Sequence, residues 1–422
     1  MIKKIMILIG CFVITSLMVS CQEENVEPLF EMGTGEIDNP FIIDSYDDLF
    51  KLDSTEFYYY EIVNDLYNTN EEIIDGSLGV FNGSLNAYGH SINDVIIINL
   101  TNKYVPMDDE VLNFGLFSEI GKSSSITNLK LVNLYISIYY SGKSNVGSLA
   151  GSMSIQSSIS NVSVTGRMNV NIKDGNIGGI VGIGQRVSSA LSDVYMGITS
   201  LQSGLTVGGI VGYSKSQIIN SMAQGDIHVV GNNHTILHDS VYDIGGIAGI
   251  SQASIAYSVN DTDITLIQND SLNLITNSIG GIAGELKESI FRCISIGTIT
   301  TDTNSVVYIG GAVGVSSYMG DVRYSLILTQ INLLGDLNPN NYYGNIAGYI
   351  ASEEDVINIY YNEEINDFYT VGNIDDSLLV GIESHSIGYY MSGEILDYFE
   401  DKADYQVGKL PRFNDFMPEY KH

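Results

Sequence analysis

The chain alternates short apolar stretches with glycine, asparagine and serine along most of its 422 residues. Glycine and asparagine weaken the interior of a helix. Frequent isoleucine and valine between these turn-forming residues favour short strands joined by tight turns. The pattern therefore predicts an all-β protein.

One five-residue element recurs seven times, at intervals of 30 to 37 residues. It opens with glycine, usually as a pair, continues with two apolar or small residues and closes with glycine. A degenerate forerunner, Gly115-Leu-Phe-Ser118, lies 32 residues before the first copy. The repeat glycines are Gly147, Gly151, Gly178, Gly179, Gly182, Gly208, Gly209, Gly212, Gly245, Gly246, Gly249, Gly280, Gly281, Gly284, Gly310, Gly311, Gly314, Gly344 and Gly348.

A second element follows each opening glycine by 10 to 13 residues and begins with a branched apolar residue. Asparagine is frequent two positions later, and small residues follow at the third. The opening residues are Ile126, Ile159, Leu191, Ile218, Ile255, Ile290, Val322 and Val356. The residues two positions later are Asn128, Asn161, Asp193, Asn220, Tyr257, Arg292, Tyr324 and Asn358.

These periods predict a solenoid, because each unit is too small to bury its apolar side without stacking on its neighbours. The opening residues would form an apolar ladder, and Cys293 would fill the core. The asparagines would bond to one another along the stack at a turn. The glycines would serve unusual backbone conformations or close approach between neighbours. Alternation through Ile244–Gly249 places apolar groups on both faces, so a bulge at the glycine pair and cover on the outer face both stay open.

The Gly-Gly-Ile-Val-Gly element, followed after about ten residues by Ile-x-Asn-Ser, resembles the GLUG repeat of bacterial surface proteins. The resemblance covers residues 115–362 and implies a right-handed parallel β-helix or related β-solenoid. Gly408–Phe413 resembles the usual ending of such arrays. GLUG repeats occur in adhesins, in lipoproteins and beside immunoglobulin-cleaving protease domains, so the resemblance does not fix an activity.

The first 21 residues have the form of an export signal. Lys3 and Lys4 precede an apolar run from Ile5 to Val19, which is short for a membrane span. Met18-Val19-Ser20-Cys21 resembles the bacterial lipobox, which implies cleavage before Cys21 and acylation of that residue. The acidic residues after Cys21 resemble surface-export signals of Bacteroidota lipoproteins. We therefore expect a lipid anchor in the outer membrane with the chain exposed at the cell surface.

Acidic flanks suit the ends of a solenoid, whose open strand edges need polar cover. Ser45 to Asp48 resembles a capping box and predicts a short helix over 46–52. A second short helix is expected over 392–402. The predicted divisions are a signal peptide (1–20), a lipidated tether (21–35), an N-terminal cap with first coils (36–114), the repeat solenoid (115–362) and a C-terminal cap (363–422).

The net charge of −32 resides mainly in the flanks, because residues 121–350 hold 13 acidic and 10 basic residues. Nucleic acid is not an expected partner, since phosphate binding needs a basic surface. The sequence predicts no cofactor and no metal site. His234 and His238 with Asp239 and Asp243 could ligate a metal on a helix, but their glycine- and asparagine-rich approach favours a loop.

The sequence predicts no enzyme. None of the six histidines begins a His-Glu-x-x-His motif, which excludes the protease chemistry associated with related arrays. A monomeric, tyrosine-rich rod with 28 tyrosines and no tryptophan suits binding or adhesion to an extracellular glycan or host protein. Two alternatives stay open: a passive structural envelope protein, and a β-helix enzyme that degrades polysaccharide with clustered carboxylates.

Overall fold

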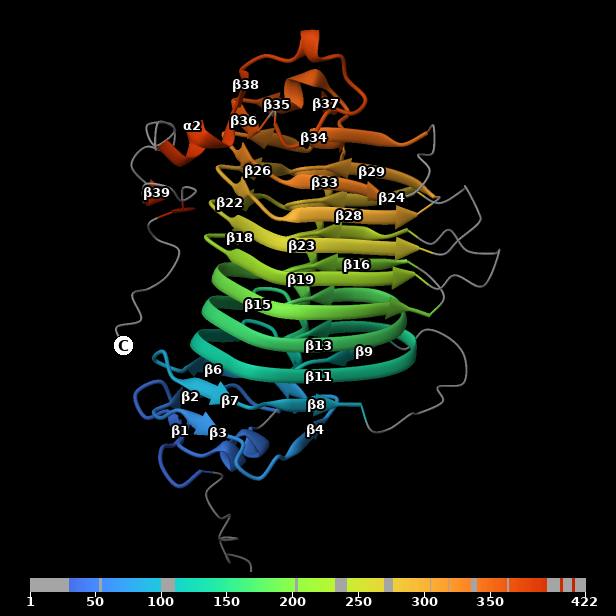
Figure 1. Ribbon diagram of the computed structural model, residues 1–422. Coiled ribbons are helices and arrows are strands. Elements are labelled where there is room, and N and C mark those ends of the chain that lie inside the picture. Colours follow the sequence, from blue (N-terminus) through green and yellow to red (C-terminus); the bar gives the residue numbers. More distant parts are fainter. Residues whose placement is uncertain are drawn as a thin grey trace, which may run out of the picture.

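The chain winds into one parallel β-solenoid whose coils stack along a single axis (Figure 1). In this computed structural model, strands β1 to β38 belong to a single sheet, and their pairings are parallel. The predicted all-β solenoid is therefore confirmed. The structure describes residues 30–52, 55–99, 111–201, 204–231, 241–268, 276–303, 305–317, 319–334, 340–362, 364–392, 403–404 and 412–413.

Strands of successive coils pair one above another in five tracks. The first comprises β1 (Phe41–Ile43), β2 (Tyr58–Ile62), β6 (Gly83–Asn86), the starts of β11 (Ser125–Gly147), β13 (Ser158–Gly178) and β15 (Arg186–Ser200), β18 (Ile218–Ile219), β22 (Ile255–Ala256), β26 (Ser289–Phe291), β31 (Asp321–Arg323) and β35 (Val356–Ile357). The second comprises β3 (Leu66–Tyr67), β7 (Ser91–Asn93), the middle of β11, β13 and β15, the starts of β19 (Met222–Gly231) and β23 (Val259–Gln268), β27 (Ile294–Ser295), β32 (Leu326–Ile327), β36 (Ile359–Asn362) and β38 (Ile382–His385).

The remaining tracks complete each coil. The third comprises β4 (Ile73–Asp75), β8 (Ile96–Ile98), the continuations of β11, β13, β15, β19 and β23, β28 (Thr298–Thr303) and β33 (Gln330–Leu334). The fourth comprises β9 (Leu112–Phe114), the ends of β11 and β13, β16 (Leu205–Gly208), β20 (Asp243–Gly245), β24 (Thr276–Gly280), β29 (Val306–Gly310) and the start of β34 (Tyr342–Tyr349). The fifth comprises β5 (Val80–Phe81), β10 (Phe117–Ile120), β12 (Ala150–Met153), β14 (Val181–Gly184), β17 (Val211–Ser214), β21 (Ala248–Ser251), β25 (Ala283–Leu286), β30 (Val313–Ser316), the end of β34 and β37 (Tyr369–Val371).

The predicted apolar ladder runs through the core of the first track, with one correction. Ile159 pairs with Val187, and Val187 pairs with Ile218, so Leu191 is not the opening residue of its coil. The prediction was wrong here because Val187 follows its opening glycine by nine residues, one fewer than the spacing used for the alignment. Leu191 instead points outward in the second track. The ladder residues are Ile126, Ile159, Val187, Ile218, Ile255, Ile290, Val322 and Val356, all buried.

A turn with left-handed backbone follows this ladder in every repeat coil. The residue two positions after each opening residue has a φ between 50° and 57°. Asparagine tolerates this conformation better than most residues, which explains its frequency there. Ser189, and not Asp193, holds the position in its coil. The full set is Asn128, Asn161, Ser189, Asn220, Tyr257, Arg292, Tyr324 and Asn358.

The glycine pair marks a sharp corner, where the fourth-track strand ends and the fifth-track strand begins after two residues. Ile177, Ile180 and Val181 around one such pair are all fully buried. The apolar residues on either side of the glycine pair are therefore all covered, because the chain turns a corner at the pair. The closing Gly182 lies against backbone atoms of Val146, and a Cβ there would come within 2.8 Å of that nitrogen. None of the repeat glycines has a positive φ. Their common requirement is therefore close approach of backbones.

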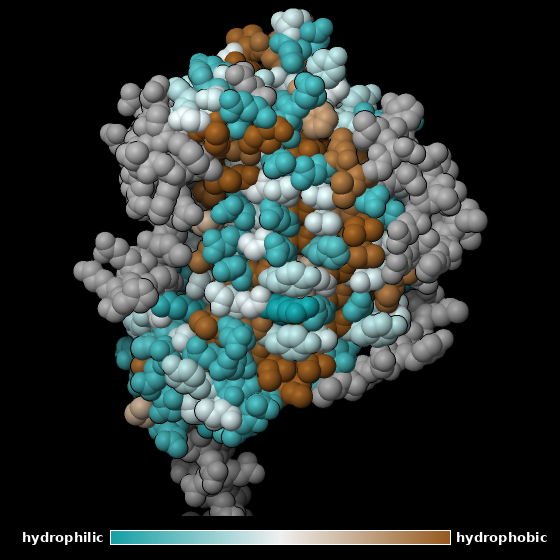
Figure 2. All heavy atoms as spheres, in the orientation of Figure 1, coloured by the Kyte–Doolittle hydropathy of each residue, from teal (hydrophilic) through white to brown (hydrophobic). Residues whose placement is uncertain are grey.

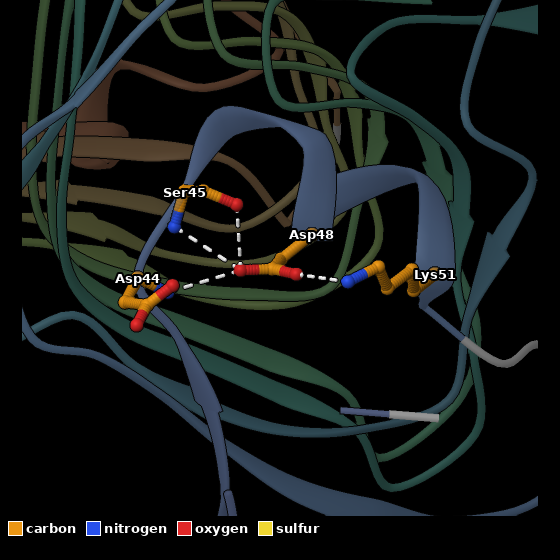
Figure 3. A network of polar contacts seen from close by, with 4 residues as sticks. All are labelled: Asp44, Ser45, Asp48 and Lys51. Carbon is orange, nitrogen blue, oxygen red and sulfur yellow. Dashed lines mark hydrogen bonds and ion pairs between the residues drawn. The ribbon is translucent and has the colours of Figure 1, made fainter. Parts of the chain in front are cut away.

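Short helices and polar turns occur in both end regions, as predicted. The N-terminal helix η1 (Tyr46–Lys51) is a 3-10 helix whose Asp48 accepts hydrogen bonds from Ser45 N (3.1 Å), Ser45 Oγ (2.8 Å) and Lys51 Nζ (2.6 Å) (Figure 3). Burial alone would raise the pKa of Asp48, but the bonds from Lys51 and Ser45 hold it below its usual value.

The described C-terminal helix precedes the one predicted over 392–402, and that prediction lies almost wholly outside the described residues. The helix α2 (Ile387–Ser392) ends at the residue where the predicted helix 392–402 begins, and residues 393–402 are outside the described part. Tyr390 of α2 is buried, and its hydroxyl donates to Tyr361 O (2.6 Å), beside the outward ladder of Ile294 and Leu326. The other end elements are η2 (Glu353–Asp355), η3 (Asp376–Leu378) and the antiparallel pair β39 (Ala403–Asp404) and β40 (Arg412–Phe413).

Candidate functional site

The residues singled out from the sequence fall into two groups. Cys21 precedes Phe30, the first described residue, so its lipidation stays a prediction. The repeat glycines from Gly147 to Gly348 are all buried, either at the glycine corners or in the fifth-track strands that follow them. They shape the solenoid and present no side chain to a ligand. Among the described residues, no helix is long and apolar enough to span a membrane.

A pocket lined by aromatic side chains lies at the C-terminal end of the stack, and we call it the tyrosine pocket. It forms where the last fifth-track strand, β37, pairs with β34, and its volume is about 560 Å³. The size falls in the range of ordinary small-molecule sites. Its lining residues are Asn341, Tyr343, Asp367, Phe368, Tyr369 and Gly372.

The aromatic groups of this pocket differ in exposure. Tyr343 and Phe368 pack with ring centroids 5.7 Å apart, whereas Tyr369 is 66% exposed. The Tyr343 hydroxyl accepts a hydrogen bond from the side-chain nitrogen of Asn341. The side-chain oxygen of Asn341 in turn accepts a hydrogen bond from Val307 N (2.8 Å). Burial raises the pKa of Tyr343, so it stays a neutral hydroxyl at physiological pH. The site offers aromatic faces beside an amide, a carboxylate and a hydroxyl.

A second aromatic cluster includes Tyr342 and Tyr349 of β34, the strand that also carries Tyr343. Tyr342 lies 5.1 Å from Tyr308 and 5.9 Å from Tyr349, measured between ring centroids. Burial raises the pKa of Tyr308, and the neighbouring tyrosines add to the shift. The coils ending at β34 therefore carry aromatic groups on both sides of one strand.

A more acidic pocket of about 300 Å³ lies at the N-terminal end, between η1 and the turn after β3. Its carboxylates come from Asp44, Asp47, Asp65 and Glu72. The Asp65 carboxylate already has partners within the protein, because it accepts a hydrogen bond from Ser91 N (2.8 Å) and lies 3.4 Å from His90 Nδ1. Within the described ranges, no three His, Cys, Asp or Glu residues are placed to hold a metal ion.

Most residues of the metal site considered in the sequence analysis lie outside the described part of the chain. His234, His238 and Asp239 lie outside the described part of the chain. Asp243, in β20, is buried, and this burial together with the nearby charge of Glu285 raises its pKa to about 7. Sequence reasoning missed the influence of Glu285 on Asp243, because the two residues come near each other only through the stacking of adjacent coils.

The fold places the protein in the class of parallel β-solenoids. Comparisons with known proteins do not assign it to a family within that class. No family model matches the chain. A segment of 163 residues is 34% identical to Halomucin of Haloquadratum walsbyi, covering 36% of this chain but only 2% of that protein. A putative immunoglobulin A1 protease from Bacteroides ovatus is similar in structure, with a TM-score of 0.41, 14% identity and coverage of 92% of this chain and 95% of that one.

Proposed function

We propose that the chain is a non-catalytic cell-surface lipoprotein that binds an extracellular glycan or protein ligand in the tyrosine pocket. In this proposal the repeats are of the GLUG type, and a monomer is anchored in the bacterial outer membrane through Cys21. The proposed protein uses no cofactor and has no nucleic-acid partner. The supporting observation is the pocket of Tyr343, Phe368 and Tyr369. The strands β34 and β37, which form it, lie at the opposite end of the stack from the N-terminal coils (Figure 1).

The chemistry of the tyrosine pocket suits binding more than catalysis. Tyrosine supplies a large contact face with a hydroxyl at little cost in conformational entropy. Asp367 is the one carboxylate among its lining residues, whereas glycoside hydrolysis needs a pair. A lipid-tethered rod would hold this pocket away from the membrane, where an outside ligand can reach it.

A glycan array and a host-matrix binding screen with residues 22–422 test the proposal. We expect a ligand whose affinity falls at least about tenfold in Tyr369→Ala, because aromatic groups carry much of the energy of such contacts. Tyr88→Ala is the matched control, since Tyr88 is 59% exposed at the other end. Absence of any ligand, or equal loss in both variants, would contradict the proposal.

One observation favours a polysaccharide-degrading enzyme as a second candidate function: the four carboxylates that line the N-terminal pocket. Incubation of the protein with a panel of polysaccharides, followed by measurement of reducing ends, tests it. Release of reducing ends that is lost in Asp44→Asn and Asp47→Asn would establish the enzyme. Identical release by these variants and the unaltered protein would reject the pocket as its site.

A further inference from the structure

Three neighbouring strands carry a positive charge that the rest of this acidic chain lacks. Strands β11, β13 and β15 contain five basic residues and two acidic ones, in a chain of net charge −32. The basic residues are Lys130, Lys143, Arg167, Lys173 and Arg186, and the acidic ones are Asp174 and Asp193. Lys143 and Asp174 form an ion pair of 3.2 Å, so part of this charge is neutralised locally.

The outward side of these strands also presents tyrosines in register with the arginine. Tyr135 pairs with Arg167, and Arg167 pairs with Tyr195 in the next coil. The Arg167 guanidinium lies 4.9 Å from the centre of the Tyr195 ring. Tyr139 extends the row along β11, and all three tyrosines are more than a third exposed. We call Tyr135, Tyr139, Arg167, Lys173 and Tyr195 the basic face.

The basic face has clear limits on the surface. Its column continues from Tyr195 to Asp226 and Asp263 in the following coils, where the charge becomes negative. Figure 2 shows the front of the stack as an open sheet surface, with polar groups across its middle. A ligand there would lie along the surface and contact several coils at once.

We propose that the basic face binds an anionic polysaccharide, with sugar rings on the tyrosines and sulfate or carboxylate groups at Arg167 and Lys173. Charge complementarity selects an anionic ligand from a molecule that otherwise repels anions. Arginine suits such groups because its planar guanidinium can bond two oxygens together. Arg167 and Lys173 are six residues apart on β13, about 20 Å at ordinary strand rise, so a chain of several sugar units lying along β13 can reach both. Tyr135 and Tyr195 lie opposite Arg167 on the two neighbouring strands, about 5 Å to either side of that path.

A polysaccharide fits the basic face better than a nucleic acid does, because the positive patch is small and its column turns acidic in the following coils. Nucleic acid would bring a dense row of phosphates onto Asp226 and Asp263 as well. The proposal is independent of the tyrosine pocket, which lies at the C-terminal end. Its failure would therefore leave the proposed function intact, and the reverse also holds.

Calorimetry with a heparin-derived octasaccharide at low and physiological salt tests the proposal. We expect binding that weakens with salt, and a loss of at least about tenfold in the double variant Arg167→Glu/Lys173→Glu. Tyr195→Ala should weaken binding with little change in salt dependence, because it removes a ring contact and no charge. Thermal unfolding of each variant checks that these exposed substitutions leave the fold intact.

Lys215→Glu is the control, since Lys215 is exposed outside the basic face and the charge change per residue is the same. It should retain affinity to within about twofold. No octasaccharide binding at low salt, equal loss in the control, or equally tight binding of a single-stranded DNA of matched charge would each overturn the proposal.

Discussion

Asp243 is a carboxyl group whose folded environment opposes its charge. Its side chain is buried beside the glycine corner, and burial together with Glu285 raises its pKa from 3.8 to about 7. A raised carboxyl pKa means that the folded protein holds a proton that the unfolded chain releases. The contribution of Asp243 to stability is therefore full below about pH 4 and falls as the pH rises to about 7.

Asp243→Asn should remove this pH dependence. We expect the variant to be more stable than the unaltered protein at pH 7.5, by about 2 kcal/mol, with the gain vanishing near pH 4. Thermal unfolding at several pH values between 4 and 8 measures it. A constant difference between the two proteins across that range would show that Asp243 does not titrate as described.

The closing glycines of the repeat leave no space for a side chain. Gly182→Ala would place a Cβ 2.5 Å from Gly151 O and 2.8 Å from Val146 N, both backbone atoms that cannot move aside cheaply. We expect a loss of more than about 3 kcal/mol in unfolding free energy. Gly197→Ala is the control, because its nearest new contact is a side-chain atom at 3.2 Å. Denaturant unfolding of both variants makes the comparison, and equal losses would contradict the account.

Individual residues were predictable where the repeat itself placed them. Cys293 was expected to fill the core, and it is fully buried with its pKa raised to about 12 by burial. Leu191 was misplaced because Val187 follows Gly178 by only nine residues, one fewer than the shortest spacing in the alignment, and an alignment without pairing partners could not detect that. Spacing between glycines cannot reveal which strands pair.

At the scale of elements, amide ladders link the early coils. Asn161 Nδ2 donates to Asn128 Oδ1 (2.7 Å), and Asn128 donates to Asn86 (2.9 Å), as the asparagine column predicted. A second ladder joins Asn176, Asn145 and Asn113 with bonds of 2.8 Å. Sequence reasoning missed it, because these residues precede the glycine element that set the alignment.

Asn145→Ala should destabilise the protein more than an ordinary surface substitution. Asn145 is 5% exposed and makes two amide bonds, so the change leaves Asn113 and Asn176 each without one partner. We expect a loss of about 2 kcal/mol. Asn169→Ala, at a half-buried position outside both ladders, should cost under about 0.5 kcal/mol. Chemical denaturation of the two variants in parallel decides whether the ladder contributes.

At the scale of the whole molecule, the sequence predicted the solenoid architecture but not the tyrosine pocket. The solenoid and its polar ends follow from periodic glycines, apolar ladders and the capping box at Ser45. The tyrosine pocket was not predictable, because Tyr343 and Tyr369 come together only when β37 pairs with β34. The high tyrosine content predicts a binding role but does not locate a site.

Membrane anchoring is tested by detergent-phase partitioning of the full-length chain expressed in a Bacteroidota host. We expect the unaltered protein in the detergent phase and Cys21→Ser in the aqueous phase, because acyl chains supply the membrane affinity. Detergent partitioning that Cys21→Ser leaves unchanged would exclude Cys21 as the anchor.

The account of the fold and of both proposed binding sites depends on the stacking of coils in the described register, and disulfide trapping measures that register directly. Ser137 pairs with Asn169 across adjacent coils, on the outward side of β11 and β13. In residues 22–422, Ser137→Cys/Asn169→Cys should crosslink rapidly, since paired strands lie about 4.8 Å apart. Ser137→Cys/Asn171→Cys, displaced to about 8 Å, should remain reduced, and buried Cys293 should not compete. Equal crosslinking of both pairs, or faster crosslinking of the second, would contradict the stacked solenoid.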